Sequence, residues 1–169
     1  MNLKCLVAVL AFAVSVCAFG ANPPGFTDDY DVALKRAATE KKMVLAVFSG
    51  SDWCFWCKML ESGFLKQKEF TDAVTNELVC LFVDSPRDKS KLSEKARVQN
   101  PKLVKKYGIT SYPSIMFLAA NGNKIADAEV PKTAVSGEWG KSLVAAAKGH
   151  AAKAAAAAKP VAKKPNAVK

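Results

Sequence analysis

The sequence predicts an α/β domain with a mixed central sheet flanked by helices. Two continuous apolar runs, at 43–48 and 78–83, are typical of strands that are covered on both faces. Segments with apolar residues at helical spacing alternate with these runs. The turn signal Asn121-Gly122-Asn123 predicts an antiparallel hairpin near the end of the domain, so the sheet should contain strands of both directions.

The other elements follow from local patterns. A first helix is expected at 27–42, because three aspartates crowd its first turn and two lysines its last, which complements the helix dipole. Asn100-Pro101 is expected to supply an N-cap and a first helical residue, after an inserted polar loop with some helix at 85–100. The remaining expected helices cover 54–66, 71–76, 101–107 and 136–148, and the hairpin strands cover 114–119 and 124–130.

The N-terminus has the pattern of a targeting segment. Lys4 precedes an apolar run at 5–19, and small residues follow it, so residues 1–20 are interpreted as a secretory signal peptide. We therefore expect export to the periplasm or outside the cell. Membrane anchoring, by an uncleaved signal or by lipidation at Cys17, is the less favoured alternative, because Val16 is bulky for lipoprotein processing.

The C-terminus is a low-complexity segment rich in lysine, alanine and proline, expected at 149–169 after a domain at 26–148. The formal net charge is +10, and six lysines but no acidic residue lie from Lys148 onward. This segment could contact an anionic envelope surface weakly, or it could be an alanine-rich extension of the last helix that ends near Pro160. An exported protein is not expected to meet nucleic acid.

Two cysteines three residues apart, Cys54 and Cys57, lie where a helix is expected to begin directly after a buried strand. The thiolate is the attacking species in disulfide exchange, and a helix N-terminus favours the anion. Cys54 is therefore the candidate nucleophile and Cys57 the candidate resolving thiol, with Lys58 adding positive charge nearby.

The alternative for such a pair is half of a zinc site. Zinc would need about two further ligands, and only Cys80 and His150 remain in the mature chain to supply Cys or His ligands. Cys80 lies inside an apolar run and is interpreted as a buried small side chain, while His150 is expected to be solvated and inert. We therefore expect neither a metal nor a cofactor.

Three segments together resemble the thioredoxin superfamily, in particular its exported bacterial, disulfide-isomerase-like members. They are 53–58, which reads Trp-Cys-Phe-Trp-Cys-Lys after a strand, then 105–109, and then 110–114 before the hairpin. The resemblance covers about 26–148 and implies a thioredoxin fold with a C-terminal hairpin and helix. It also implies a cis peptide bond before Pro113, with this proline lying against the cysteine pair.

The resemblance also implies a substrate groove around the cysteines. The residues expected to line it or to tune the pair are Trp53, Phe55, Trp56, Lys58, Tyr112 and Pro113. Phe55-Trp56 stands where the family often has Gly-Pro or Pro-His. Val47 stands where the family has a buried acid that assists proton transfer to the second cysteine, so Asp52 or Glu61 is a candidate replacement.

The function predicted from this resemblance is that of a protein thiol–disulfide oxidoreductase working through Cys54 and Cys57. Its partners would be proteins with disulfides or thiols, together with a redox partner that the sequence does not identify. The alternative function is a binding or scaffold protein on the same fold, with a structural Cys54–Cys57 disulfide and a cationic tail that binds the envelope.

Overall fold

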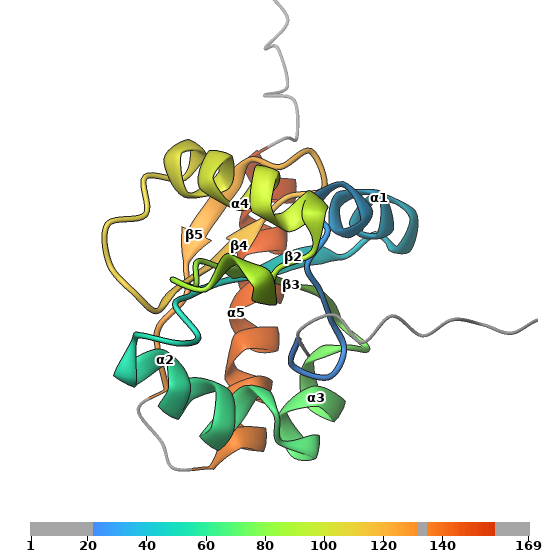
Figure 1. Cartoon of the computed structure of the whole chain (residues 1–169). Helices are drawn as coiled ribbons and strands as arrows, with labels where there is room; N and C mark the ends of the chain where they lie inside the picture. The colour runs from blue at the N-terminus through green and yellow to red at the C-terminus, as the bar shows by residue number, and fades with distance from the viewer. Residues whose placement is uncertain (1–21, 132–134, 158–169) are drawn as a thin grey trace, which may run out of the picture.

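The computed structural model describes residues 22–131 and 135–157, and it has helices on both faces of one five-stranded sheet (Figure 1). The predicted fold class is confirmed. The strands are β1 (Phe26–Thr27), β2 (Met43–Ser49), β3 (Leu78–Asp84), β4 (Ser114–Leu118) and β5 (Lys124–Asp127). The helices are α1 (Tyr30–Glu40), α2 (Phe55–Leu60), the π-helical turn η1 (Glu61–Leu65), α3 (Lys68–Val74), the 3-10 turn η2 (Lys89–Lys91), α4 (Glu94–Lys106) and α5 (Ser136–Ala157).

The sheet has the order β1-β3-β2-β4-β5 and mixes both strand directions, as predicted. β2 pairs in parallel with β3, β4 is antiparallel to both β2 and β5, and a turn at 119–123 joins β4 to β5. Because β2 and β4 are antiparallel, Ser114 at the start of β4 pairs with Phe48 near the end of β2. The segment that follows β2 and the segment that precedes β4 therefore meet at the same end of these two central strands.

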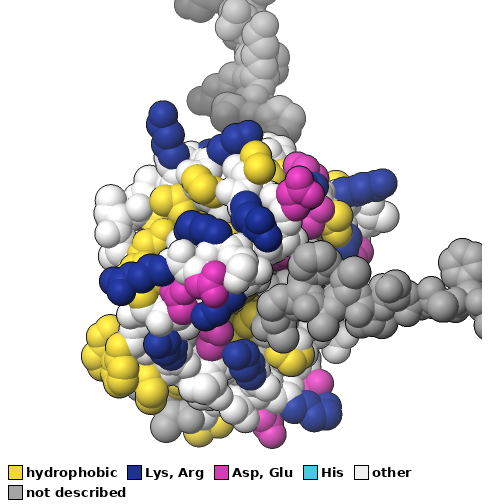
Figure 2. Space-filling model, in the orientation of Figure 1, with side chains coloured by type: hydrophobic (Ala, Val, Ile, Leu, Met, Phe, Trp, Pro, Cys, Tyr) yellow, Lys and Arg dark blue, Asp and Glu magenta, His cyan; other side chains and the backbone are white. Residues whose placement is uncertain are grey.

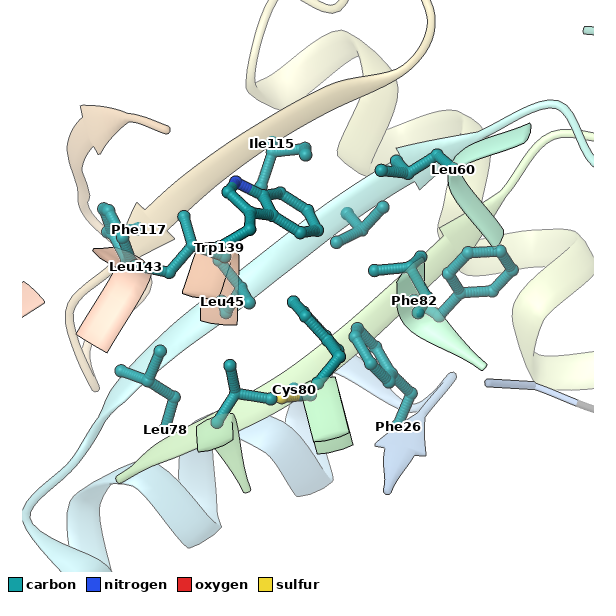
Figure 3. Close-up of a cluster of buried hydrophobic side chains, with 14 of the residues drawn as sticks. Phe26, Leu45, Leu60, Leu78, Cys80, Phe82, Ile115, Phe117, Trp139 and Leu143 are labelled. Carbon is teal, nitrogen blue, oxygen red and sulfur yellow. The ribbon is translucent and has the colours of Figure 1, made fainter. Parts of the chain in front are cut away.

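The period-two pattern of the strands divides the core between two faces. Even-numbered residues of β2 pack with α1 and α4, and odd-numbered residues pack with α2, α3 and α5. Figure 3 shows part of the second face, where Leu45, Cys80, Phe82 and Trp139 lie among other apolar side chains. Each large side chain buried in this way stabilises the fold by about 1.5–3 kcal/mol. Leu60 of α2 belongs to the odd-numbered face, so this face holds α2 against the sheet.

Several predicted boundaries differ from the observed ones. The prediction that Asn100-Pro101 begins a helix is wrong, because α4 begins at Glu94, where Ser93 Oγ accepts a hydrogen bond from Ala96 N, and Pro101 lies inside it. The helix continues past the proline because the side chain of Asn100 is buried and donates to Asp84 O, which holds α4 on the sheet. The sequence also did not predict β1, a two-residue strand that forms by pairing with the edge of β3.

The C-terminal helix is longer than predicted. α5 continues through Ala157 instead of ending at Lys148, which agrees with the alternative of an alanine-rich helical extension. The expected domain boundary at 148–149 therefore lies within this helix, and the predicted signal peptide and residues 158–169 lie outside the described residues. Among the described residues, no helix combines the length and the apolar character needed to cross a membrane.

Candidate active site

Cys54 and Cys57 form a disulfide at the start of α2, where the sequence predicted a redox pair. Cys54 is the N-cap of the helix, and its Sγ accepts a hydrogen bond from Cys57 N at 3.2 Å. The two cysteines differ in access, since 7% of the surface of Cys54 is exposed and none of the surface of Cys57. An incoming disulfide can therefore approach Cys54 but not Cys57.

The segment before β4 forms the opposite wall of the site. The Tyr112–Pro113 peptide bond is cis, as the resemblance implied, and Tyr112 O lies 3.7 Å from Cys54 Sγ. The pairing of Ser114 with Phe48 explains this proximity, because it brings the end of β2 and the start of β4 together. Tyr112 and Pro113 are both half-buried and remain open to a partner on one side.

The loop after β3 forms a third wall that the sequence did not predict. The Trp53 indole donates to Ser85 O at 2.8 Å, and the Tyr112 hydroxyl lies 3.3 Å from Ser85 Oγ. Trp53 and Tyr112 meet edge to face at 5.4 Å, and the Arg87 guanidinium lies 5.9 Å from the Trp53 ring. The indole is thus fixed beside the cysteine pair by a loop that the sequence identified only as an insertion.

Asp52 holds this loop in place. Its carboxylate accepts hydrogen bonds from Arg87 N and Asp88 N, both at 2.9 Å. These two N–H donors keep the pKa of Asp52 below its ordinary value. Of the two acids that the sequence left open as proton-transfer groups, Asp52 therefore has a structural role on the loop side of the site.

Glu61 is a buried acid close to the cysteine pair. It lies one helical turn after Cys57, with Ser49 Oγ donating to its Oε1 at 2.9 Å and Lys66 Nζ 3.5 Å from its Oε2. Burial raises the pKa of Glu61 above its ordinary value, although Ser49 and Lys66 act in the opposite direction. Ser49 is two residues beyond Val47 on the same face of β2, so this chain supplies an acid from the helix where the family supplies one from the strand.

A polar cavity of about 370 Å³ lies beside this carboxylate. Its wall includes Glu61, Lys66 and Asp84, and the Asp84 carboxylate is held by Ser51 through both its N–H and its hydroxyl. A polar space of this size can hold water, which connects a buried carboxyl group to solvent. The cavity wall contains neither cysteine, so it reaches the Glu61 carboxylate without passing Cys54 or Cys57.

The two residues between the cysteines point outward. Phe55 and Trp56 are 65% and 70% exposed and touch each other edge to face at 5.4 Å. Figure 2 shows hydrophobic side chains gathered over the start of α2, with lysines and arginines around them. Core packing therefore does not explain these aromatic residues, and Lys58 is likewise exposed.

Cys80 and His150, the other two candidate zinc ligands, lie in β3 and α5 and not beside the cysteine pair. Within residues 22–131 and 135–157, no three His, Cys, Asp or Glu side chains are grouped closely enough to hold a metal ion. Cys80 is buried in β3, where desolvation raises its pKa to about 12, so its interpretation as a core residue is confirmed. His150 was predicted to be solvated; it is half-buried, because the longer α5 places its ring 5.9 Å from that of Phe117.

A family profile described as a thioredoxin-like domain matches residues 30–136. The chain belongs to this family. The predicted superfamily and fold are confirmed, and the structure holds Cys54 and Cys57 at disulfide distance on this fold.

Named relatives agree with this membership. The disulfide bond reductase DsbH of Chlamydia pneumoniae is 31% identical over 99 residues, which cover 59% of this chain and 59% of DsbH. The thioredoxin-related protein DsbJ of the same organism is 30% identical over 97 residues, covering 57% of this chain and 28% of DsbJ. A solved structure of a DsbH oxidoreductase has a TM-score of 0.61 at 25% identity, covering 77% of this chain and 89% of that chain.

Proposed function

We propose that this protein is an exported thiol–disulfide oxidoreductase that reduces disulfide bonds in other proteins through Cys54 and Cys57. The observation that carries the proposal is the Cys54–Cys57 disulfide facing the carbonyl group of Tyr112, with only Cys54 open to solvent. Reduction is the proposed direction because the relative DsbH is named a disulfide bond reductase.

The proposed reaction has two exchanges. The Cys54 thiolate attacks one sulfur of the client disulfide, the client S–S bond breaks, and the departing client thiolate takes up a proton. Cys57 then loses its proton and attacks Cys54 Sγ. The mixed disulfide breaks, and the second client thiolate leaves and takes up a proton. The protein is left with an oxidised Cys54–Cys57 pair, which a redox partner reduces again.

Glu61 is the proposed acceptor of the Cys57 proton. It follows Cys57 by four residues on the same face of the helix, and it is buried with Ser49 as its hydrogen-bond partner. A raised pKa brings a carboxyl group closer to the pH at which it can both take and release a proton. The neighbouring polar cavity gives that proton a route to solvent.

The groove roles follow from the positions of the side chains around Cys54. Pro113 and Tyr112 would lie along a bound client backbone, and Trp53 would close the groove on the loop side. Phe55 and Trp56 would contact the client from above the pair, and Lys58 would add positive charge that favours the thiolate.

The test is reduction of a protein disulfide by the wild type, Cys54→Ser and Cys57→Ser. We expect Cys54→Ser to be inactive and Cys57→Ser to accumulate a mixed disulfide with the client, seen by non-reducing electrophoresis and mass spectrometry. A wild type no faster than Cys54→Ser would overturn the enzymatic proposal and favour a binding protein with a structural disulfide.

The direction is tested by the reduction potential of the Cys54/Cys57 couple. A value of about −270 mV is expected for a reductase, whereas a value of about −120 mV would make the protein an oxidase.

Export is tested by fractionating the source cells and determining the N-terminal residue of the mature chain. Any weak contact of the basic tail with an anionic surface should disappear on truncation after Ala157, which leaves α5 intact.

A further inference from the structure

The turn η1 brings a lysine to the Glu61 carboxylate. Lys66 N donates to Glu61 O at 2.9 Å, and this bond spans five residues instead of the four of an α-helix. In an α-helix each residue adds about 100° of rotation, so side chains five positions apart point to different sides. The wider π-helical turn keeps Glu61 and Lys66 on one side, and Lys66 Nζ lies 3.5 Å from Glu61 Oε2. Turns of this kind are rare, and they occur frequently at functional sites.

Lys66 contacts both the carboxylate and the solvent. Its side chain is 48% exposed, whereas that of Glu61 is 11% exposed, and both residues line the polar cavity of about 370 Å³. An ammonium group on a flexible stem is strongly hydrated and can change its partner easily. It can therefore pair with Glu61 while the carboxylate is charged, and turn to water once the carboxyl group is neutral.

The other charged groups around the cavity have partners of their own. They are Asp28, Asp84 and Lys91. Serine hydroxyl groups donate to both carboxylates, and the lysine lies 3.9 Å from a third carboxylate, that of Asp52. Among the described residues, Lys66 is thus the cation that forms an ion pair with Glu61. Ser49 adds an uncharged donor from β2, and the negative charge of Asp84 on β3 opposes the effect of Lys66.

We propose that Lys66 is a positioning residue for the second exchange: its ammonium group holds Glu61 as the carboxylate that accepts the proton of Cys57. This inference rests on the proposed function. Burial favours the neutral carboxyl group, which cannot accept a proton, whereas a cation at 3.5 Å favours the carboxylate. Lys66 therefore offsets part of the effect of burial and keeps Glu61 ready for the next exchange.

The proton passes from Cys57 to Glu61 and then to water. The Cys57 S–H bond breaks, the proton binds a Glu61 oxygen, and the thiolate attacks Cys54 Sγ and displaces the client thiolate. Glu61 is then neutral, so its attraction to Lys66 ends. The carboxyl group returns the proton to water that enters the polar cavity, and the ion pair forms again.

The test removes the charge of Lys66 and keeps a side chain of similar length. Reduced wild type, Lys66→Gln and Lys66→Arg react with dithiobis(nitrobenzoate), which releases one coloured thiolate in the first exchange and another in the second. Stopped-flow absorbance follows the second exchange over a range of pH. In Lys66→Gln the pH midpoint of this step should rise by about one unit, so that the step is about tenfold slower below the midpoint. Lys66→Arg keeps the charge and should keep the wild-type midpoint.

Lys68→Gln is the matched control. Lys68 lies two residues further along the chain, its side chain is 81% exposed and paired with Asp72, and it is not part of the cavity wall. Its removal changes the net charge by the same amount and should leave the midpoint unchanged. Circular dichroism and thermal unfolding establish that all the variants are folded.

A second measurement follows Glu61 itself, independently of the exchange reaction. The NMR resonance of the Glu61 carboxyl carbon, identified by its loss in Glu61→Gln, is titrated in the reduced protein. Its midpoint should be about one pH unit higher in Lys66→Gln than in wild type or Lys68→Gln. A lysine with only a structural role would not move this midpoint.

The outcomes separate this inference from the proposed function. An unshifted NMR midpoint in folded Lys66→Gln overturns the inference and leaves the oxidoreductase intact. A shifted NMR midpoint with an unchanged second exchange does the same, because the ion pair then has no part in the reaction. Equal shifts in Lys66→Gln and in either Lys68→Gln or Lys66→Arg also overturn it. A wild type that releases no second thiolate removes both the proposed function and the inference that rests on it.

Discussion

The cysteine pair at the start of α2 and the single cysteine in β3 are the same functional group in opposite settings. Burial alone does not separate them, because Cys57 is fully buried and Cys80 is 1% exposed. Their neighbours do separate them. The pair has an N-cap hydrogen bond, a polar wall and a buried acid one turn away, whereas Cys80 lies among apolar side chains (Figure 3).

This difference teaches that a reactive thiol needs a polar neighbourhood more than it needs exposure. Desolvation raises the pKa of Cys80 to about 12, since a thiolate in the middle of a sheet has no donor to stabilise it. At the start of α2, the backbone N–H of Cys57 supplies such a donor to Cys54 Sγ.

The largest expected effect is on catalysis. Cys54→Ser should reduce the rate of protein-disulfide reduction to the background rate, because no other thiol near the groove is accessible. Cys80→Ala is the matched control and should keep the wild-type rate while lowering the free energy of unfolding by about 1 kcal/mol. A Cys80→Ala variant that is folded but inactive would contradict the contrast.

Alkylation of the reduced protein should distinguish the thiols directly. With a pKa of about 12, Cys80 has on the order of one thiolate in 10⁴ molecules at pH 8, so iodoacetamide should label Cys54 and leave Cys80 free. Peptide mass spectrometry identifies the labelled residue, and the same reaction in denaturant should label Cys54, Cys57 and Cys80. Equal labelling of Cys80 in the native protein would show that β3 opens to solvent.

Glu61 should affect the second exchange more than the first. In Glu61→Gln, the carboxyl group that is proposed to accept the Cys57 proton is lost, while an amide keeps a hydrogen bond with Ser49. Resolution of a preformed Cys54 mixed disulfide should slow by on the order of 10²-fold, whereas formation of that mixed disulfide should change little. Stopped-flow kinetics of the two steps measure the difference, and equal slowing of both would argue for a merely structural role.

The smallest effect is on the pH dependence of stability. Because the folded-state pKa of Glu61 is raised, its contribution to stability is fully present below its ordinary value of 4.5 and is lost as the pH rises through the folded pKa. Wild type should therefore lose stability relative to Glu61→Gln across that interval. Chemical denaturation at a series of pH values measures it, and a constant difference between the two proteins would contradict the raised pKa.

Much of the site was predictable because it depends on local patterns. A buried strand, a loop and a Cys-x-x-Cys helix start are consecutive in the sequence, and the resemblance added Pro113 opposite them.

The boundaries of α4 were not predictable from local patterns. Pro101 is a helix breaker by local rules, but the buried Asn100–Asp84 hydrogen bond and the packing of α4 prevail over it.

The two candidate acids near the cysteines show the same limit of prediction from local patterns. The sequence placed both Asp52 and Glu61 near the cysteines and left their roles open. Only the structure shows that Asp52 accepts N–H groups of the 87–88 backbone, while Glu61 is buried beside Ser49. The loop wall formed by Ser85 and Arg87 was equally hidden, because contacts between residues more than thirty positions apart leave no periodic signal.

By itself, the sequence determined the alternation of strands and helices, the family, and the position of the cysteine pair. These features depend on hydrophobic periodicity and on short motifs, which act over a few neighbouring residues. The tertiary structure alone decided that Cys54 is more accessible than Cys57, and that Glu61 is buried beside Ser49 while Asp52 accepts hydrogen bonds from the loop. Those properties depend on how distant segments pack, because packing sets both the access of solvent and the electrostatic environment of each group.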